Sequence, residues 1–297
     1  MGGDLGALSY QVIRTMNLVS IVIPCYNSGA TLGQTVASAK AQTWPNIEII
    51  VIDDGSSDPM TREVLAALLD VTVVRQPNSG LPAARNAGFH AARGEYVLPL
   101  DADDWLEPET IMVLLQALKA SPTADFAFCD SRLEGEASGR LHKNYNYFEQ
   151  LFLNQLPYCL LIPKQLWEEV GGYDATLRQG YEDWEFNIRL GRHGHHGLRI
   201  AQPLFHYRVS GSGMLISKSN RLHGLLWSEI QARHRSVYKL LNLYRLWREW
   251  TDKPSHYPLA LYFIWFGLHR LLPASAFSML FKYLRMRTHH RRSSSAG

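Results

Sequence analysis

Three carboxylates, Asp101, Asp103 and Asp104, follow directly after an apolar run at residues 96–100. Such a run predicts a buried strand, so the acids come at its carboxyl end, where an open α/β sheet places its ligand crevice. Acids this close repel one another and raise one another's pKa, and a cation among them relieves the repulsion. Asp101 and Asp103 point the same way in an extended segment. The spacing predicts a divalent-metal site, and capping of the helix after Pro108 stays open as the alternative.

Two further polar groups are expected at the same edge of the sheet. Asp54 follows a second apolar run at residues 47–52, and an acid there can accept hydrogen bonds from a nucleoside; helix capping is the alternative. Arg85 lies in an expected helix at residues 81–93 that starts near the strand ends. Its planar guanidinium suits phosphate or base edges, and an ion pair with one of the acids is compatible with that role.

Candidate groups also occur late in the chain. Glu182 and Asp183 open an expected helix that runs to about residue 193, and such an acid is a candidate general base for a hydroxyl nucleophile. His206 and Arg208 end an expected strand at residues 204–209, where His206 is a candidate metal ligand and Arg208 can reach the same pocket. The alternatives are capping for the acids and a structural role for the histidine.

The elements that position these residues alternate between strand and helix. Strands are expected at residues 18–24, 47–52, 71–74, 96–100 and 125–129, with helices at 31–42, after 59, at 81–93 and at 108–120. This rhythm predicts an α/β fold with a mostly parallel sheet and right-handed crossovers. Residues 131–160 are expected to form irregular loops over the site, and the chain beyond residue 219 is expected to be helical.

The charge distribution divides the chain. Residues 1–214 carry 16 Lys and Arg against 24 Asp and Glu, whereas residues 215–297 carry 14 against 3. We therefore expect an N-terminal extension at 1–17, a catalytic domain at 18–214 and a basic helical extension at 215–297 with a flexible end. The three scattered cysteines favour a reducing compartment. The first residues lack a signal-peptide pattern, so a cytoplasmic location is expected.

Taken together, these motifs resemble family 2 glycosyltransferases with the GT-A fold. The resembling blocks occur in the expected order at residues 19–27, 49–57, 78–88, 100–104 and 171–184. The resemblance implies a Rossmann-like sheet flanked by helices, and a metal-dependent hexosyltransferase that inverts the anomeric centre. The chain has neither the Gln-x-x-Arg-Trp motif nor the membrane spans of processive synthases, so it resembles the single-addition branch.

The resemblance also implies roles for individual residues. The nucleotide pocket would be lined by Pro24, Tyr26 and Asn27, with Asp54 on the base, Arg85 on the base or phosphates, Asp101 at the ribose side, and Arg208 near the diphosphate. Mn²⁺ or Mg²⁺ would be held by Asp103, with Asp101 and His206 in the metal shell. Asp183 would be the catalytic base, with Glu182 beside it.

The implied reaction moves a sugar from a nucleotide-sugar, with UDP as the expected nucleotide, to a hydroxyl of a glycan or lipid-linked acceptor. Its expected setting is the assembly of a polysaccharide, glycolipid or cell-envelope glycan. Two alternatives remain: a catalytically inactive sugar-nucleotide-binding module, which the intact acids disfavour, and a nucleotidyltransferase. The latter usually has a Gly-rich loop after the first strand, where this chain has residues 24–27.

The basic tail has an interrupted apolar pattern. Residues 257–268 carry no charge, but the run is shorter than the roughly 20 apolar residues that a spanning helix needs. Basic residues mixed with Trp, Phe and Leu favour peripheral contact with the inner face of a membrane through residues 253–292, aided by Arg285, Arg287, Arg291 and Arg292. A helical subdomain that packs on the core is the alternative. Nucleic-acid binding is not expected, because no recognised module is present.

Overall fold

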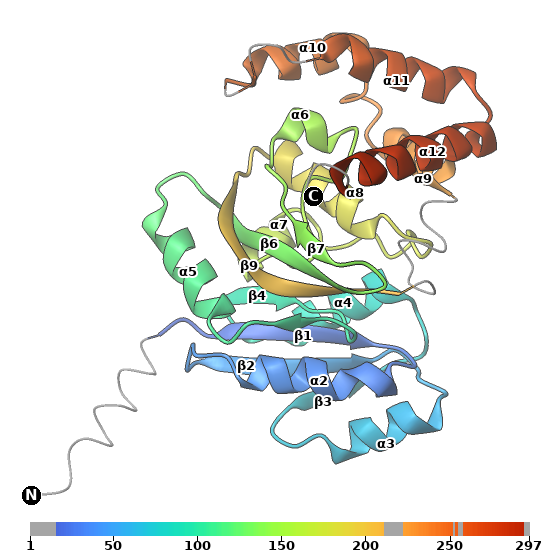
Figure 1. The fold of residues 1–297 in the computed structure, drawn as a ribbon. Helices are drawn as coiled ribbons and strands as arrows, with labels where there is room; N and C mark the ends of the chain where they lie inside the picture. The colour runs from blue at the N-terminus through green and yellow to red at the C-terminus, as the bar shows by residue number, and fades with distance from the viewer. Residues whose placement is uncertain (1–15, 211–221, 252, 255–257, 294–297) are drawn as a thin grey trace, which may run out of the picture. The chain divides into compact units, whose positions relative to one another are not determined.

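The computed structural model describes residues 16–210, 222–251, 253–254 and 258–293, and the side chains of these ranges up to residue 283. The described residues form two compact units. The first comprises residues up to 145, 155–178 and 182–209, and the second comprises 146–154, 179–181 and the residues from 210 onward. Figure 1 shows the course of the chain through both units.

The first unit contains a five-stranded sheet in the order β3-β2-β1-β4-β8. Its strands are β1 (Val19–Cys25), β2 (Ile47–Asp53), β3 (Thr72–Arg75), β4 (Tyr96–Pro99) and β8 (Ile162–Pro163). β1 is buried along its whole length and pairs in parallel with both β2 and β4, while β8 is antiparallel to β4. The mostly parallel sheet agrees with the alternation of strands and helices in the sequence.

Three helices link these strands: α2 (Gly29–Lys40), α3 (Pro59–Ala67) and α4 (Leu81–Ala91). Asp58 caps α3, because its side chain accepts the backbone N–H of Thr61 at 2.8 Å and Pro59 occupies the first helical position. α4 packs tightly on the sheet at Gly88. A Cβ atom there would lie 2.1 Å from Cγ1 of Val22, so this helix position requires glycine.

A second sheet has the order β5-β9-β6-β7. Its strands are β5 (Trp105–Leu106), β6 (Phe126–Gly135), β7 (Gly139–Leu141) and β9 (Gly197–Val209), and α5 (Thr110–Ala120) precedes β6. The expected strands at 125–129 and 204–209 therefore belong to β6 and β9, which are longer and pair with each other in parallel. Part of the expected irregular segment 131–160 is strand, because Arg140 and Arg199 bind the buried carboxylate of Asp130 across β7, β6 and β9.

Two more helices complete the first unit, α7 (Lys164–Glu169) and α8 (Glu182–Arg192). Edge-to-face ring contacts join Phe89 of α4 to Trp167 of α7 and to Tyr173. Tyr173 in turn packs on Phe186 of α8, with ring centroids 4.6 Å apart. This aromatic cluster fixes the start of α8 relative to α4.

The second unit is helical, with α6 (Tyr147–Gln150), α9 (His223–Arg233), α10 (Leu240–Glu249), α11 (Leu259–Leu271) and α12 (Ala274–Ser293). Trp227 and Tyr238 both donate hydrogen bonds to the backbone carbonyl of Leu151, at 3.1 and 2.7 Å. The expected boundary at residue 214 lies outside the described residues, and the inclusion of residues 146–154 in this unit was not expected. Among the described residues, no helix combines the length and apolar character that crossing a membrane requires.

Candidate active site at the carboxyl edge of the parallel sheet

The strand order predicts a ligand site at one edge of the five-stranded sheet. β1 pairs in parallel with β2 on one side and β4 on the other, so the order of strands reverses at β1. In open α/β sheets this switch point is where ligands bind, outside the carboxyl ends of the strands. Tyr26, Asp54 and Asp101 follow the ends of β1, β2 and β4 respectively, so the topology gathers the predicted residues at this edge.

Asn27 fixes the conformation of the turn after β1. This residue has φ of 51°, and its Oδ1 accepts the backbone N–H groups of Ser57 and Asp58 at 2.9 and 3.0 Å. Asparagine tolerates this left-handed conformation better than most residues. Pro24 is buried in β1, whereas Tyr26 is half exposed. Of the three predicted pocket residues, Tyr26 is the exposed one and Asn27 shapes the loop.

The carboxylate of Asp54 is used within the protein. Its oxygens accept hydrogen bonds from the Gln76 side chain at 2.7 Å and from the backbone N–H groups of Ser79 and Gly80 at 2.8 and 2.9 Å. The side chain is buried, and these bonds set the loop that leads into α4. Its predicted contact with a nucleotide base stays a prediction.

Arg85 of α4 is the centre of the site, and only 1% of its side chain is exposed. Its Nη1 donates to Glu182 Oε1 at 2.7 Å, and its Nη2 donates to both oxygens of Asp101 at 2.8 and 3.0 Å. The guanidinium also lies over the rings of Tyr158 and Tyr173. Arg85 thus forms the ion pair that the sequence left open and joins α4, the end of β4 and the start of α8. Its predicted direct contact with the base or phosphates stays a prediction.

The two acids at the start of α8 have different surroundings. Burial raises the pKa of Glu182 to about 7; the charge of Arg85 opposes this rise and that of Asp183 adds to it. Asp183 is only partly buried, and its Oδ1 accepts the backbone N–H of Trp184 at 2.8 Å. Asp183 is therefore the more accessible carboxylate, and Glu182 is the one fixed by Arg85.

The acids after β4 also divide in role. Asp104 is buried and accepts hydrogen bonds from the Tyr158 hydroxyl at 2.5 Å and from the backbone N–H of Arg208 at 2.7 Å. Burial raises the pKa of Asp103 to about 6, and the charge of Asp101 adds to the rise. The alternative prediction that Asp103 or Asp104 caps α5 is wrong, because the N-cap residue of α5 is Glu109 and no side chain caps this helix.

Asp101 and Asp103 fit a divalent cation by the chemistry of their donors. Both are hard oxygen ligands, and one or two carboxylates that share the ion with substrate phosphates suit Mg²⁺ and Mn²⁺. Burial and the neighbouring charge of Asp101 raise the pKa of Asp103, and a cation between the two carboxylates would oppose that rise.

Arg208 and His206 lie on β9 and differ in their neighbours. Arg208 Nε donates to the backbone carbonyl of Asp103 at 2.9 Å, so its guanidinium borders the acidic turn. His206 has Nε2 2.8 Å from Glu107 and Nδ1 3.1 Å from Glu134, and its ring stacks on Trp105. Both ring nitrogens are therefore engaged away from Asp101 and Asp103, and we leave His206 out of the proposed metal shell.

Three tyrosines were missed as site residues. Tyr158 bridges the Asp104 carboxylate and the backbone N–H of Asp101, and Tyr173 packs on Arg85. Burial raises the pKa of Tyr207, and the charges of Asp104, Asp101, Asp103 and Asp183 add to the rise. The sequence offered a signal for two of them, because Tyr173 lies in the family block 171–184 and Tyr207 lies between His206 and Arg208.

Comparisons with known proteins agree with this geometry. The family model for glycosyl transferase family 2 matches residues 20–184. The chain is 37% identical over 249 residues to a putative glycosyltransferase, EpsH, of Bacillus subtilis, covering 76% of this chain and 72% of EpsH. It is 33% identical over 141 residues to the chondroitin synthase of Pasteurella multocida, covering 46% of this chain and 14% of the synthase.

Among solved structures, the fold is similar to that of S. aureus TarS in complex with UDP-GlcNAc. The TM-score is 0.60 at 18% identity, over 78% of this chain and 69% of the TarS chain. The predicted α/β fold of the GT-A type is confirmed, and so is glycosyltransferase activity as the function class. The chain belongs to glycosyl transferase family 2.

Proposed function

We propose that this chain transfers a sugar from a UDP-sugar to a hydroxyl of a glycan or lipid-linked acceptor, with inversion of the anomeric centre and in the presence of Mn²⁺ or Mg²⁺. One observation carries the proposal. Arg85 holds Asp101 at the end of β4 and Glu182 at the start of α8 in one buried ion-pair cluster. This cluster brings the candidate metal ligands and the accessible Asp183 to one edge of the sheet.

The donor and the setting are supported by the relatives. The similar TarS structure contains UDP-GlcNAc, which favours a UDP-sugar as the donor here. The matching chondroitin synthase and hyaluronan synthase of Pasteurella multocida favour the assembly of a polysaccharide or a related envelope glycan. Tyr26 is exposed beside the switch point, where its ring can stack on the uracil.

The residues of the chain divide the work of the reaction. A cation held by Asp101 and Asp103 would stabilise the negative charge of the leaving diphosphate. Asp183 accepts the proton of the acceptor hydroxyl. At the same time the acceptor oxygen bonds to the anomeric carbon, and the bond from that carbon to the diphosphate oxygen breaks. Arg208, beside Asp103, contributes positive charge next to the phosphates. Arg85 keeps Asp101 and Glu182 in place, and alignment of the three reacting atoms supplies much of the rate.

The test is release of nucleotide from a panel of UDP-, GDP- and dTDP-sugars, with and without added glycan acceptors. We expect acceptor-dependent release of UDP with Mn²⁺ or Mg²⁺, loss of release in excess EDTA, and recovery when the cation is restored. Full transfer in chelator would remove the metal from the proposal. Binding of UDP-sugar without release, under any acceptor or cation, would identify an inactive module instead.

We also propose that the second unit contacts a membrane surface through residues 253–292. Leu261, Ile264 and Leu271 lie along α11 with exposed fractions of 62%, 57% and 82%. Their spacing places them on one side of the helix, opposite the buried Phe266. An apolar stripe of this kind next to basic residues suits a helix in the interface of an anionic bilayer. The arginines at 285, 287, 291 and 292 have side chains outside the described residues.

A further inference from the structure

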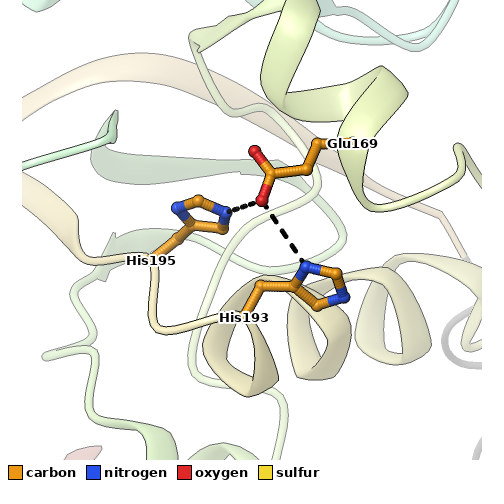
Figure 2. A group of neighbouring side chains, drawn as sticks. All are labelled: Glu169, His193 and His195. Carbon is orange, nitrogen blue, oxygen red and sulfur yellow. Dashed lines mark ion pairs between the residues drawn. The ribbon is translucent and has the colours of Figure 1, made fainter.

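Away from the candidate active site, one carboxylate and two imidazoles converge on the surface of the first unit (Figure 2). Glu169 Oε1 lies 3.6 Å from His193 Nδ1 and 3.3 Å from His195 Nε2. These three atoms all lie within 4.8 Å of one another. Nothing in the proposed sugar transfer uses them.

The backbone builds this convergence at the ends of two helices. Glu169 is the last residue of α7, and His193 and His195 flank Gly194 directly after α8. Gly194 has φ of +86°, with hydrogen bonds from its own N–H to Gly191 and from the N–H of His195 to Leu190. This Schellman ending turns both imidazoles toward Glu169. The carbonyl ends of helices carry partial negative charge, which favours a cation there.

The three atoms lie close together without aligned hydrogen bonds, and this geometry suits a shared ion. Neither imidazole makes an aligned hydrogen bond to Glu169, and His195 Nε2 is buried without a hydrogen-bond partner among the described residues. In a tetrahedral zinc site with bonds of about 2.1 Å, neighbouring ligand atoms lie roughly 3.4 Å apart. Two of the three separations, 3.3 and 3.6 Å, already match that edge.

We propose that Glu169, His193 and His195 form a binding site for a first-row transition-metal cation of the Zn²⁺ type. Two imidazole nitrogens and one carboxylate oxygen are a donor set that selects Zn²⁺ over Mg²⁺. Asp125 lies on the other side of the His195 ring, with its Oδ1 3.7 Å from Nδ1. Glu169 and His193 are about half exposed, so the fourth coordination position is open to water.

Other charges nearby leave Glu169 available to the ion. Arg189 packs next to the junction of α7 and α8, but its guanidinium binds both oxygens of Glu185 and the carbonyl of Val170. The three cysteines are buried, so their thiols do not compete for the metal.

The ion would tie α7 to α8, and α8 carries Glu182 and Asp183 at its other end. His193 follows Glu182 by eleven positions, which is about 16 Å along the helix at 1.5 Å per residue. The proposed ion is therefore distinct from the one that Asp101 and Asp103 would hold, and its role is to stabilise the first unit.

The test is calorimetric titration of the full chain with ZnCl₂ in buffer that contains saturating Mg²⁺, which occupies the hard oxygen site. Glu169→Gln and His193→Ala remove exposed ligands with little risk to folding. His196→Ala is the matched control, because 77% of that side chain is exposed and His196 is not part of the cluster of three. Any zinc bound by other histidines appears equally in all variants.

We expect wild type and His196→Ala to bind one more zinc ion than Glu169→Gln and His193→Ala, or to bind it at least about tenfold more tightly. Zinc at 100-fold excess over its Kd should raise the melting temperature of wild type by roughly 5 °C and that of the two ligand variants by clearly less. Co²⁺ should give the intense visible bands of four-coordinate cobalt in wild type and His196→Ala, but not in Glu169→Gln or His193→Ala. Equal stoichiometry, affinity and thermal shift in all four proteins would overturn the proposal.

Discussion

At the scale of single residues, the site depends on one guanidinium shared by two carboxylates. Arg85 has almost no exposed surface, and its ion pairs with Asp101 and Glu182 cross three separate elements. The sequence identified all three residues and left an ion pair of Arg85 with an acid open, while the family resemblance implied contact of Arg85 with the nucleotide. The reason is physical: the sequence pattern shows that a helix with an arginine starts near the strand ends, but only the three-dimensional packing shows that Tyr158 and Tyr173 lie against its guanidinium.

The first prediction concerns the catalytic base. Asp183→Asn keeps the size and the hydrogen bond to Trp184 but cannot accept the acceptor proton, so turnover should fall by ~10²-fold or more while UDP-sugar affinity changes little. Steady-state kinetics and calorimetric donor binding measure the two quantities. Glu168→Gln, which removes an exposed acid on α7, is the control and should retain wild-type turnover. Wild-type turnover in Asp183→Asn would remove it from the role of base.

The second prediction concerns pH. Burial raises the pKa of Glu182 from an ordinary 4.5 to about 7, against the opposing charge of Arg85. Because the folded-state pKa is raised, this acid's contribution to stability is complete below about pH 4.5 and is lost as pH rises through about 7. In metal-free buffer, the free energy of unfolding should therefore fall less between pH 5 and 7.5 in Glu182→Gln than in wild type.

Urea titrations of both proteins across that range give the comparison. Asp103, whose pKa burial raises to about 6, changes stability in the same direction and is present in both proteins. The slope of the unfolding free energy against pH should thus be shallower in Glu182→Gln than in wild type, but it should not be zero. Parallel stability curves for the two proteins would show that Glu182 titrates as it does in the unfolded chain.

At the scale of elements, strong periodic runs were predictable and short or half-exposed ones were not. The buried runs of β1, β2 and β4 lie within a residue or two of their predicted places. β5 and β8 have two residues each, too few to show a period. The first part of β9 is half exposed and contains Pro203, so it reads as loop until its pairing with β6 is known. These strands form because they pair with strands that are distant in sequence, which a local pattern does not show.

The third prediction uses two helical glycines. Gly88→Ala adds a Cβ that would meet Val22 at 2.1 Å, so α4 must move and carry Arg85 with it. We expect a net loss of about 1–2 kcal/mol in unfolding free energy and a lower turnover, since overpacking outweighs the gain in helix propensity. Gly33→Ala in α2 meets nothing within 4 Å and should stabilise by about 0.5–1 kcal/mol. Urea unfolding and kinetics of both variants test the contrast, and equal effects would contradict it.

At the scale of the whole molecule, the division into two units depends on contacts between residues far apart in sequence. Residues 146–154 come from the middle of the chain but join the C-terminal helices, because Trp227 and Tyr238 bind the carbonyl of Leu151 from 76 and 87 residues away. Tyr262 also donates to Glu149. Charge and composition placed the change in character near residue 214, but no local pattern marks an insertion of this kind.

The last prediction concerns the apolar stripe of α11. Replacing Leu261, Ile264 and Leu271 by Gln removes about 1.5–3 kcal/mol of burial for each side chain that enters the bilayer, so co-sedimentation with anionic vesicles should weaken at least about tenfold. These side chains are exposed, so the substitutions should change the stability of the folded unit little, and thermal melting measures that stability. Met60→Gln with Leu69→Gln, at exposed apolar positions of the first unit, is the matched control and should pellet like wild type.

Since the attraction to the vesicles also includes basic residues, raising the salt concentration should release the triple variant before wild type. Equal pelleting of all three proteins at every salt concentration would mean that these three side chains do not enter the bilayer. It would contradict the proposal that α11 contacts the membrane.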